Sequence, residues 1–232
     1  MGELSIIVLG DGLLGIEIVK QTNWSYISRK KDNIDFTSPS TYFDYLLKYD
    51  IILNCIAHTD TYSLDKDKHW DINYKYVVKL ARFCKAHCKK LIHISTDYVY
   101  ANNERVPSEE DVPVHAENWY SYTKLLGDAA VQLESKSNLV LRCTHKPTPF
   151  PYDEAWMDQY GNFDYVDVIA KLIIRTIYNN GVGLYNIGTL CKNMYELALR
   201  TNKNVKKGVP PASAPKSVIM KITKLNNISN DR

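Results

Sequence analysis

A glycine-rich turn near the start of the chain limits the folds that are open to it. Residues 4–9 form an apolar run broken only by Ser5, a glycine-rich hexapeptide follows, and apolar residues then recur at helical spacing over 13–20. An apolar run without alternation is typical of a strand buried on both faces, as in a parallel sheet. Glycines at this junction permit a tight turn and let a pyrophosphate approach the N–H groups at the positive end of the helix dipole. The G-x-G-x-x-G spacing therefore predicts a dinucleotide site made by Gly10, Asp11, Gly12, Leu13, Leu14 and Gly15.

The chain downstream of this turn alternates between strand and helix patterns. Apolar runs predict strands at 4–9, 24–28, 51–55, 91–95, 139–142 and 184–187, and helical spacing predicts helices at 13–20, 39–47, 67–87, 119–133 and 166–178. Such alternation with short connections predicts an α/β fold, a Rossmann-type doubly wound parallel sheet with helices on both faces.

Two proline-rich stretches, 144–156 and 208–215, interrupt this alternation. Because prolines break regular elements, we expect both stretches to lie outside the sheet, where a substrate-covering lobe would be. The predicted NAD(P)-binding Rossmann domain comprises residues 1–143 and 163–188. Residues 144–162 and 189–232 are predicted to form a small C-terminal substrate-binding lobe.

Composition argues against several classes of protein. No apolar run approaches the roughly 18 residues that a membrane-spanning helix needs, and the N-terminus lacks the basic segment and apolar core of a secretory signal. The five cysteines are odd in number and several lie in apolar stretches, which predicts free thiols in a reducing compartment and a cytoplasmic protein. Cys84, His87 and Cys88 fall within one helical turn, but no second ligand cluster accompanies them, so no metal site is expected.

Positive charge is concentrated at the C-terminal end. Residues 201–232 carry a net charge of +6, whereas the first 200 residues carry −3. A basic end can attract phosphates, but this one contains no aromatic side chain on which a base could stack. A solvated basic end is therefore the favoured interpretation, and a nucleic-acid partner is disfavoured.

The end of the second predicted strand bears on the choice of cofactor. Sites for NAD place an acidic residue there for the ribose hydroxyls. This chain instead continues Ser28-Arg29-Lys30-Lys31 and has no carboxylate before Asp32. A hydroxyl and two or three cations suit the 2′-phosphate of NADP, so NADP(H) is favoured over NAD(H). Ordinary loop lysines are the alternative interpretation.

A tyrosine and a lysine on one predicted helix suggest proton chemistry. Tyr120 and Lys124 lie four residues apart and therefore share a helix face. A nearby ammonium favours the phenolate, so we expect Lys124 to lower the pKa of Tyr120 and ease proton exchange. Ser95 and Thr96 end a strand, at the edge where doubly wound sheets bind ligands. A hydroxyl, a tyrosine and a lysine beside a glycine turn are typical of a reductase.

These features together resemble the extended short-chain dehydrogenases/reductases, and within them the dTDP-4-dehydrorhamnose reductase family. Residues 93–100, H-I-S-T-D-Y-V-Y, are similar to that family's serine–threonine–aspartate–tyrosine–valine signature, and residues 120–128, Y-S-Y-T-K-L-L-G-D, resemble its tyrosine–lysine helix. Further similarity lies in the glycine turn, in Asp35-Phe36-Thr37, in residues 50–59 with Asn54, and in Asn73. The similarity is dense over residues 4–143, thinner over 163–188 and faint in the tail.

The resemblance implies a role for each matching residue. Tyr120 would donate the proton, Thr96 would hydrogen-bond the sugar at the reacting carbon, and Lys124 would orient the ribose and tune Tyr120. Asn73 would provide structural support or join a water relay, which makes four catalytic positions. Asp97 and Tyr98 would join Thr96 at the substrate. The cofactor contacts implied outside the glycine turn are Ser28, Arg29, Lys30, Cys55, Ile56, Ala57, His58, Tyr120 and Lys124, with Asp35 and Phe36 flanking the adenine.

The function implied by the resemblance is the NADPH-dependent reduction of a 4-keto-6-deoxy nucleotide sugar in deoxysugar biosynthesis, such as that of dTDP-rhamnose. Reductases of this type are often homodimers. A non-catalytic relative, such as the regulatory subunit of methionine adenosyltransferase, is one alternative, and a nucleotide-sugar epimerase or dehydratase is another. The complete set of Thr96, Tyr120 and Lys124 favours an enzyme over a binding module. The lone Asp97 disfavours a dehydratase, which would use an acid/base pair beside that threonine.

The chain also departs from the family at three places. It has one residue fewer between its first two glycines, and Thr61-Tyr62 stands where a valine–aspartate pair is common. It is short after residue 143, so the resemblance bears more on cofactor binding than on the identity of the sugar.

Overall fold

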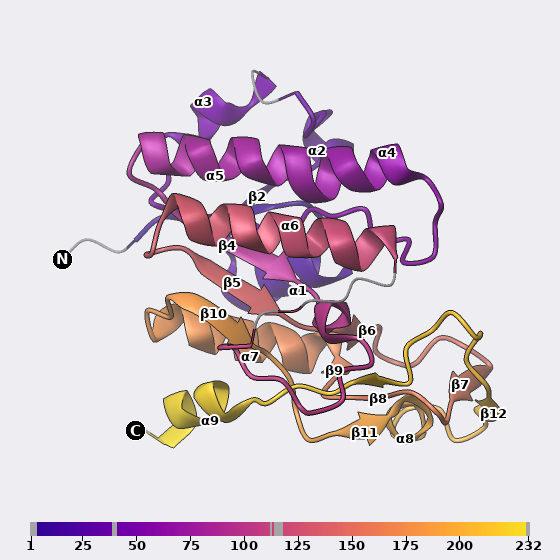
Figure 1. Ribbon diagram of the computed structural model, residues 1–232. Coiled ribbons are helices and arrows are strands. Elements are labelled where there is room, and N and C mark those ends of the chain that lie inside the picture. Colours follow the sequence, from indigo (N-terminus) through magenta and orange to yellow (C-terminus); the bar gives the residue numbers. More distant parts are fainter. Residues whose placement is uncertain (1–3, 39–40, 112, 114–117, 231–232) are drawn as a thin grey trace.

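The computed structural model of the chain describes residues 4–38, 41–111, 113 and 118–230. Its centre is a six-stranded sheet in the order β10-β5-β4-β3-β1-β2, in which every neighbouring pair is parallel (Figure 1). The strands are β1 (Ile6–Leu9), β2 (Ser25–Ile27), β3 (Ile51–Asn54), β4 (Lys90–Ser95), β5 (Leu139–Arg142) and β10 (Gly183–Asn186). Each agrees with a predicted strand to within two residues at either end, so the predicted α/β fold with a doubly wound parallel sheet is confirmed.

Helices cover both faces of the sheet because successive strand residues point into two different cores. On β1, Ile7 contributes to the core beneath α3, α5 and α6, whereas Val8 contributes to the core beneath α1 and α7. Figure 1 shows α5 and α6 side by side on the first face. Leu225 of α9 joins the second core. The helices are α1 (Leu13–Thr22), α3 (Phe43–Leu46), α5 (Tyr76–Ala86), α6 (Trp119–Glu134), α7 (Val166–Tyr178) and α9 (Thr223–Asn230).

Two helical segments differ from their predicted forms. The predicted helix 67–87 is a continuous helical segment made of α4 (Lys66–His69), a π-helical turn η2 (Trp70–Lys75) and α5. The predicted helix 39–47 is reduced to the single turn α3, which suffices to bury Leu46, and its first two residues lie outside the described residues. None of the helices in the described ranges is long and apolar enough to cross a membrane.

Short strands build a small lobe beyond the carboxyl ends of the main sheet (Figure 1). Their pairs are β7 (Glu154–Trp156) with β12 (Lys206–Gly208), β8 (Tyr160–Gly161) with β11 (Lys192–Asn193) and β13 (Ser217–Val218), and β6 (His145–Lys146) with β9 (Asp164–Tyr165). Together with α8 (Met194–Ala198) these segments enclose a core of their own around Phe163 and Leu197. The predicted domain boundaries, and the role of this lobe in binding substrate, stay predictions.

Candidate active site

A cavity of about 400 Å³ lies between the carboxyl edge of the main sheet and the small lobe. It brings together ten of the predicted site residues: Gly12, Leu13, Leu14, Gly15, Cys55, Ala57, Thr96, Tyr98, Tyr120 and Lys124. The other predicted site residues lie outside its lining: Gly10, Asp11, Ser28, Arg29, Lys30, Asp35, Phe36, Ile56, His58, Asn73 and Asp97. The predicted catalytic hydroxyls and lysine therefore share one cavity with the glycine turn.

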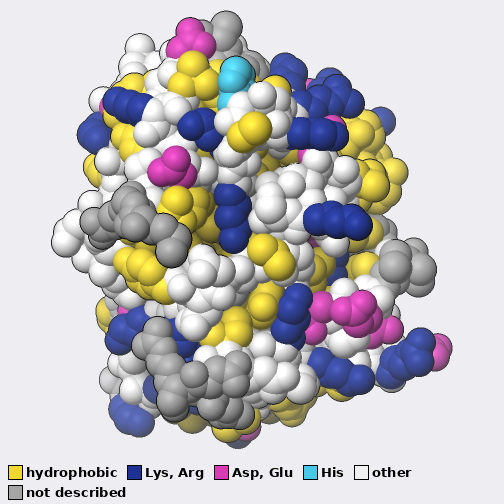
Figure 2. All heavy atoms as spheres, turned by 90° about the vertical axis from the view of Figure 1, so that its left-hand side faces the viewer, with side chains coloured by type: hydrophobic (Ala, Val, Ile, Leu, Met, Phe, Trp, Pro, Cys, Tyr) yellow, Lys and Arg dark blue, Asp and Glu magenta, His cyan; other side chains and the backbone are white. Residues whose placement is uncertain are grey.

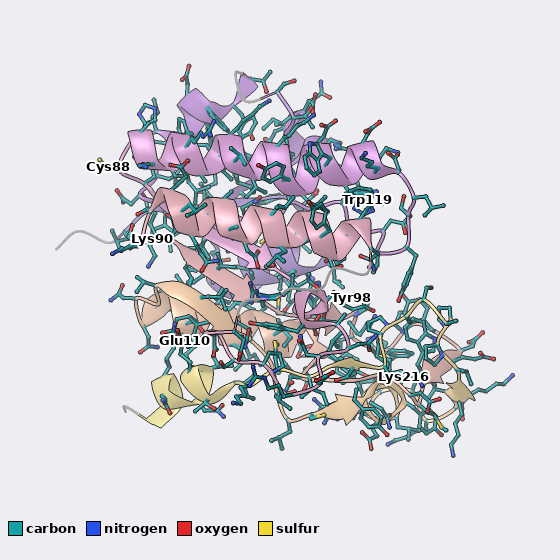
Figure 3. All side chains as sticks on the ribbon, viewed as in Figure 1. Cys88, Lys90, Tyr98, Glu110, Trp119 and Lys216 are labelled. Atoms are coloured by element: carbon teal, nitrogen blue, oxygen red, sulfur yellow. The ribbon has the colours of Figure 1, made fainter. Side chains whose placement is uncertain are left out.

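The cavity lining also contains residues that the sequence analysis did not single out. Thr144, His145 and Lys146 follow the carboxyl end of β5, and Gln159 comes from the small lobe. The place of the first three after a strand was a usable signal, since ligands collect at that edge of a doubly wound sheet. Gln159 gave no such signal. Its Nε2 donates a hydrogen bond of 3.2 Å to the hydroxyl of Tyr98, which lies at the junction of the helical layer and the small lobe (Figure 3).

The glycine turn has the geometry that close approach of a phosphate requires. Gly10 adopts φ +97°, a backbone conformation that side chains disfavour. A Cβ on Gly15 would lie 2.2 Å from the carbonyl oxygen of Gly10, so only glycine fits there. Gly12 caps the N-terminus of α1 without a side chain, and a Cβ on it would have no atom within 4 Å. The turn thus leaves the N-terminal N–H groups of α1 open to the cavity.

The basic residues after β2 form a short helix rather than the end of a strand. In α2 (Arg29–Asp32), Ser28 Oγ accepts a hydrogen bond of 3.0 Å from the backbone N–H of Lys31, and the Ser28 N–H donates one of 2.8 Å to Asp32 Oδ2. These two bonds satisfy donors at the helix start and explain why a helix forms here. Arg29 and Lys30 are exposed, whereas the Asp32 carboxylate is engaged with Ser28.

The two residues expected beside an adenine are committed to local contacts. Asp35 accepts hydrogen bonds from the hydroxyl and N–H of Thr37 and from the hydroxyl of Ser38, and the bond from the Thr37 hydroxyl contributes most to lowering the pKa of Asp35. The ring of Phe36 is buried in the core, edge-on to Tyr42 and Tyr76. The role of both residues beside the adenine stays a prediction.

Tyr120 differs from expectation in its protonation. Burial raises the pKa of its phenol well above the usual range, and hydrogen bonding to Thr96 opposes that rise without cancelling it. The expectation that Lys124 lowers this pKa was wrong, because removal of the phenol from water outweighs any favourable charge. Tyr120 is therefore a neutral phenol near physiological pH, which is the form that can donate a proton. Tyr122, two residues along the same helix, is 39% exposed.

Lys124 is an almost fully buried lysine. Its Nζ donates a hydrogen bond of 2.6 Å to the backbone carbonyl of Ile94 and lies 3.3 Å from Nε2 of His93. Burial lowers the pKa of Lys124 to about 8, although the charge of Asp128 favours the ammonium. The lysine is therefore close to the point at which it gains or loses its proton, and its position is set by groups of β4.

The segment after β4 orients three predicted substrate contacts differently. Thr96 Oγ1 caps the 3₁₀ turn η3 (Asp97–Tyr100) by accepting a hydrogen bond of 3.2 Å from the N–H of Tyr98. The carboxyl of Asp97 is fully buried and accepts a hydrogen bond from the hydroxyl of Thr144, and burial raises the pKa of Asp97 to about 6. Thr96 and Tyr98 thus line the cavity, whereas Asp97 points into the protein behind it.

Asn73 braces the loop after β3 against two helices. Its Oδ1 accepts a hydrogen bond of 2.8 Å from the N–H of His58, and its Nδ2 donates to the carbonyl of His58 at 3.1 Å and to Thr123 Oγ1 at 3.3 Å. Asn73 lies in the π-helical turn η2, a distortion that is common at functional sites. These contacts fit the structural support that the resemblance implies. No group of three or more potential metal ligands occurs among the residues that the structure describes.

Comparison with known proteins points to one family. A family model described as "RmlD substrate binding domain" matches residues 4–145. A probable dTDP-4,6-dihydroxy-2-methyloxan-3-one 4-ketoreductase of Streptomyces antibioticus is 31% identical over 139 residues, which cover 56% of this chain and 47% of that protein. The dTDP-4-dehydrorhamnose reductase of Mycolicibacterium smegmatis is 26% identical over 179 residues, which cover 74% of this chain and 51% of that protein. The chain spans about half the length of the curated relatives it matches.

Solved structures match over a larger share of the chain. The dTDP-4-dehydrorhamnose reductase of Bacillus anthracis, solved in complex with NADP, has a TM-score of 0.84 at 20% identity and covers 97% of this chain and 92% of that chain. The Bordetella bronchiseptica enzyme WbmG, in complex with NAD, has a TM-score of 0.78 at 14% identity, and the match covers 97% of this chain and 87% of that chain. At these identities the likeness supports the fold alone. The family match spans more than half of the chain, which therefore belongs to the RmlD substrate binding domain family, within the extended short-chain dehydrogenases/reductases.

Proposed function

We propose that the protein is an oxidoreductase that uses NADPH to reduce the 4-keto group of a 6-deoxy nucleotide sugar. The observation that carries this proposal is the shared cavity, in which Thr96, Tyr120 and Lys124 face the glycine turn at the carboxyl edge of the sheet. The similarity to that family supports a dTDP- or UDP-linked sugar as the proposed substrate and deoxysugar biosynthesis as the proposed process.

The residues of the turn suit a dinucleotide. Gly15 leaves no room for a side chain against Gly10, so α1 can pack closely on the turn. The open N-terminus of α1 at Gly12 offers backbone N–H groups to a pyrophosphate. When bound, a dihydronicotinamide supplies the hydride for ketone reduction.

The protein's own residues supply the proton and the orientation. Tyr120, held as a neutral phenol by burial, donates its proton to the carbonyl oxygen as that oxygen becomes a hydroxyl. Thr96 and Tyr98 provide hydroxyls on the cavity wall that can hydrogen-bond the sugar. Lys124, within the same helix face, holds the ribose and offers a positive charge that stabilises the phenolate left on Tyr120.

The preference for NADP(H) rests on the segment after β2. Arg29 and Lys30 are exposed there, and the carboxylates of Asp32 and Asp35 are engaged in local hydrogen bonds. Cations that are free to contact a 2′-phosphate, next to carboxylates that are occupied, favour NADP(H) over NAD(H).

The experiment that tests this function measures oxidation of NADPH by the purified protein with a panel of 4-keto-6-deoxy nucleotide sugars. Turnover with at least one dTDP- or UDP-linked ketone is expected. A protein that binds NADPH but oxidises it with none of them would favour the non-catalytic regulatory role. Conversion of a nucleotide sugar with tightly held NAD⁺ and no added reductant would favour an epimerase or dehydratase.

Assembly and location complete the proposal. We expect a homodimer in the cytoplasm, and light scattering on the purified protein tests whether it is a dimer.

On the face shown in Figure 2, lysine and arginine side chains are dispersed among acidic, hydrophobic and uncharged groups rather than gathered in one patch. The described residues of this face therefore do not form the basic stripe that a nucleic-acid backbone would need.

A further inference from the structure

A histidine lies in the middle of the sheet, beneath the predicted catalytic helix. His93 is a fully buried residue of β4. Its Nδ1 lies 3.1 Å from Nδ2 of Asn54, which ends β3, and its Nε2 lies 3.3 Å from Nζ of Lys124. The chemistry proposed above gives this histidine no role, yet it contacts the buried amino group of Lys124.

The hydrogen bonds of Asn54 fix which nitrogen of His93 carries the proton. Asn54 Oδ1 accepts a hydrogen bond of 3.1 Å from the backbone N–H of Ile56 and one of 3.4 Å from the hydroxyl of Tyr76. A backbone N–H can only donate, so Oδ1 must face it and Nδ2 must face His93. An amide NH₂ can only donate as well, so Nδ1 of His93 is the acceptor.

The imidazole of His93 is also neutral. Burial, reinforced by the charge of Lys124, holds the pKa of His93 well below its usual range. A neutral ring carries one proton, and Nδ1 is occupied as an acceptor. The proton therefore resides on Nε2, the nitrogen that faces Lys124.

This tautomer leaves the ammonium of Lys124 poorly paired on the side of the core. An ammonium has donors and no acceptor, so it meets the Nε2–H of His93 as a second donor. Its remaining partner there is the carbonyl of Ile94. The carboxylate of Asp128 accepts a bond of 2.9 Å from Arg142 Nε through its Oδ2, and its buried Oδ1, which has no hydrogen-bond partner among the described residues, lies 4.0 Å from Nε2 of His93. A neutral amine, in contrast, can accept the proton of Nε2–H.

We propose that Asn54 and His93 form a pair that positions Lys124. The Nε2–H of His93 disfavours the charged amino group of Lys124 on the core side, so the charged amino group is favoured when it points toward Tyr120 and the cofactor ribose. The reference to a ribose rests on the proposed function. The tautomer, and its effect on Lys124, are properties of this chain without any ligand.

Several other groups near Lys124 also affect whether its amino group is charged. Asp128 acts on it from α6, Cys55 from just after β3, and Cys143 from just after β5, and Tyr120 lines the same cavity. Burial raises the pKa of both thiols, that of Cys55 to about 12, so neither is charged near neutrality. Tyr120 is neutral for the same reason, which leaves Asp128 as the group that favours the ammonium. The N–H of His93 and the burial of Lys124 act against it.

Nuclear magnetic resonance of the ligand-free protein tests the proposal. Nitrogen-15 shifts of the imidazole report directly which nitrogen of His93 is protonated, and carbon-13 labelling of the lysine Cε follows the titration of Lys124, assigned with Lys124→Met. We expect the proton on Nε2. In Asn54→Asp a carboxylate replaces the donor, the His93 proton should move to Nδ1, and the titration midpoint of Lys124 should rise by about one pH unit, because Nε2 then accepts from the ammonium.

Two further variants separate the tautomer from the added charge. Asn54→Leu removes the amide donor without adding a charge and should raise the same midpoint by a smaller amount. Tyr76→Phe, the matched control, removes the second donor to Asn54 Oδ1 but keeps the bond from Ile56, so neither the tautomer nor the midpoint should change. In both Asn54 variants NADPH should bind roughly tenfold more weakly at neutral pH, since Lys124 stays on the core side.

The outcome does not depend on the substrate. A His93 proton found on Nδ1 in the wild-type protein would overturn the proposal even if every variant failed to fold. An unchanged Lys124 midpoint in both Asn54 variants, with the tautomer changed, would overturn it too. Neither result bears on whether the enzyme reduces a nucleotide sugar, so the two claims can fail separately.

Discussion

The ion pair between Asp128 and Arg142 should be among the most costly buried interactions to break. Both side chains are almost completely buried, and Arg142 Nε lies 2.9 Å from Asp128 Oδ2. The pair links α6, which carries Tyr120 and Lys124, to β5. Asp128→Asn keeps the shape of the side chain but leaves the guanidinium buried without a counter-charge. Removal of one partner of such a pair costs about 3–5 kcal/mol in the free energy of unfolding.

Thermal and urea unfolding of the ligand-free protein measure this cost. For a chain of this size each kcal/mol lowers the melting temperature by roughly 2–4 °C, so Asp128→Asn should melt about 6–20 °C below the wild type. Glu134→Gln on the same helix is the matched control, because Glu134 pairs with Arg82 and Lys85 at the exposed end of α6. Exposed pairs contribute about 0–1 kcal/mol. Equal, small losses for both variants would refute the claim that the buried pair anchors the helix.

Three further predictions concern the cofactor and pH. Gly15→Ala places a Cβ 2.2 Å from the Gly10 oxygen, so it should lower the melting temperature and abolish NADPH binding in a fluorescence titration. Gly12→Ala, with no atom within 4 Å of its Cβ, should leave the melting temperature unchanged, and an equal fall in melting temperature in both variants would refute the packing argument. Arg29→Ala should weaken NADPH more than NADH, and an equal loss for both cofactors would remove Arg29 from the 2′-phosphate site. The pKa of Lys124 is lowered to about 8, below the ~10.4 of an unfolded chain, so the unfolded state binds more protons between those values. The wild type should therefore gain stability relative to Lys124→Met as pH rises from about 8 to about 10, and a constant difference in urea unfolding would contradict this sign.

Much of the fold could be predicted because its strands are buried on both faces. Residues 6–9 and 51–54 are apolar or buried at every position, so their runs stand out without any alternation. The common face of Tyr120 and Lys124 followed from helical spacing alone. The place of Thr96 in the site, just after the carboxyl end of β4, followed from the rule that ligands gather at that edge of the sheet.

The features that could not be predicted depend on contacts between distant segments. The strands of the small lobe are two or three residues long, too short to show a period. The helix α2 forms because Asp32 Oδ2 accepts a hydrogen bond from the Ser28 N–H and Ser28 Oγ accepts one from the Lys31 N–H. Counting the cations in the sequence does not reveal these bonds. The pKa of Tyr120 was predicted with the wrong sign because the sequence shows its neighbour Lys124 but not the depth of its burial.

The central claim is that Tyr120 delivers the proton in a ketone reduction, and a comparison of two tyrosine variants tests it most directly. Initial rates of NADPH oxidation with an active 4-keto nucleotide sugar would be measured for the wild type, Tyr120→Phe and Tyr122→Phe. Each variant loses one oxygen from the same helix, but Tyr120 lines the cavity and Tyr122 does not. Turnover should fall roughly 10²–10⁴-fold in Tyr120→Phe, with NADPH affinity nearly intact, and far less in Tyr122→Phe. Full activity in Tyr120→Phe would contradict the account.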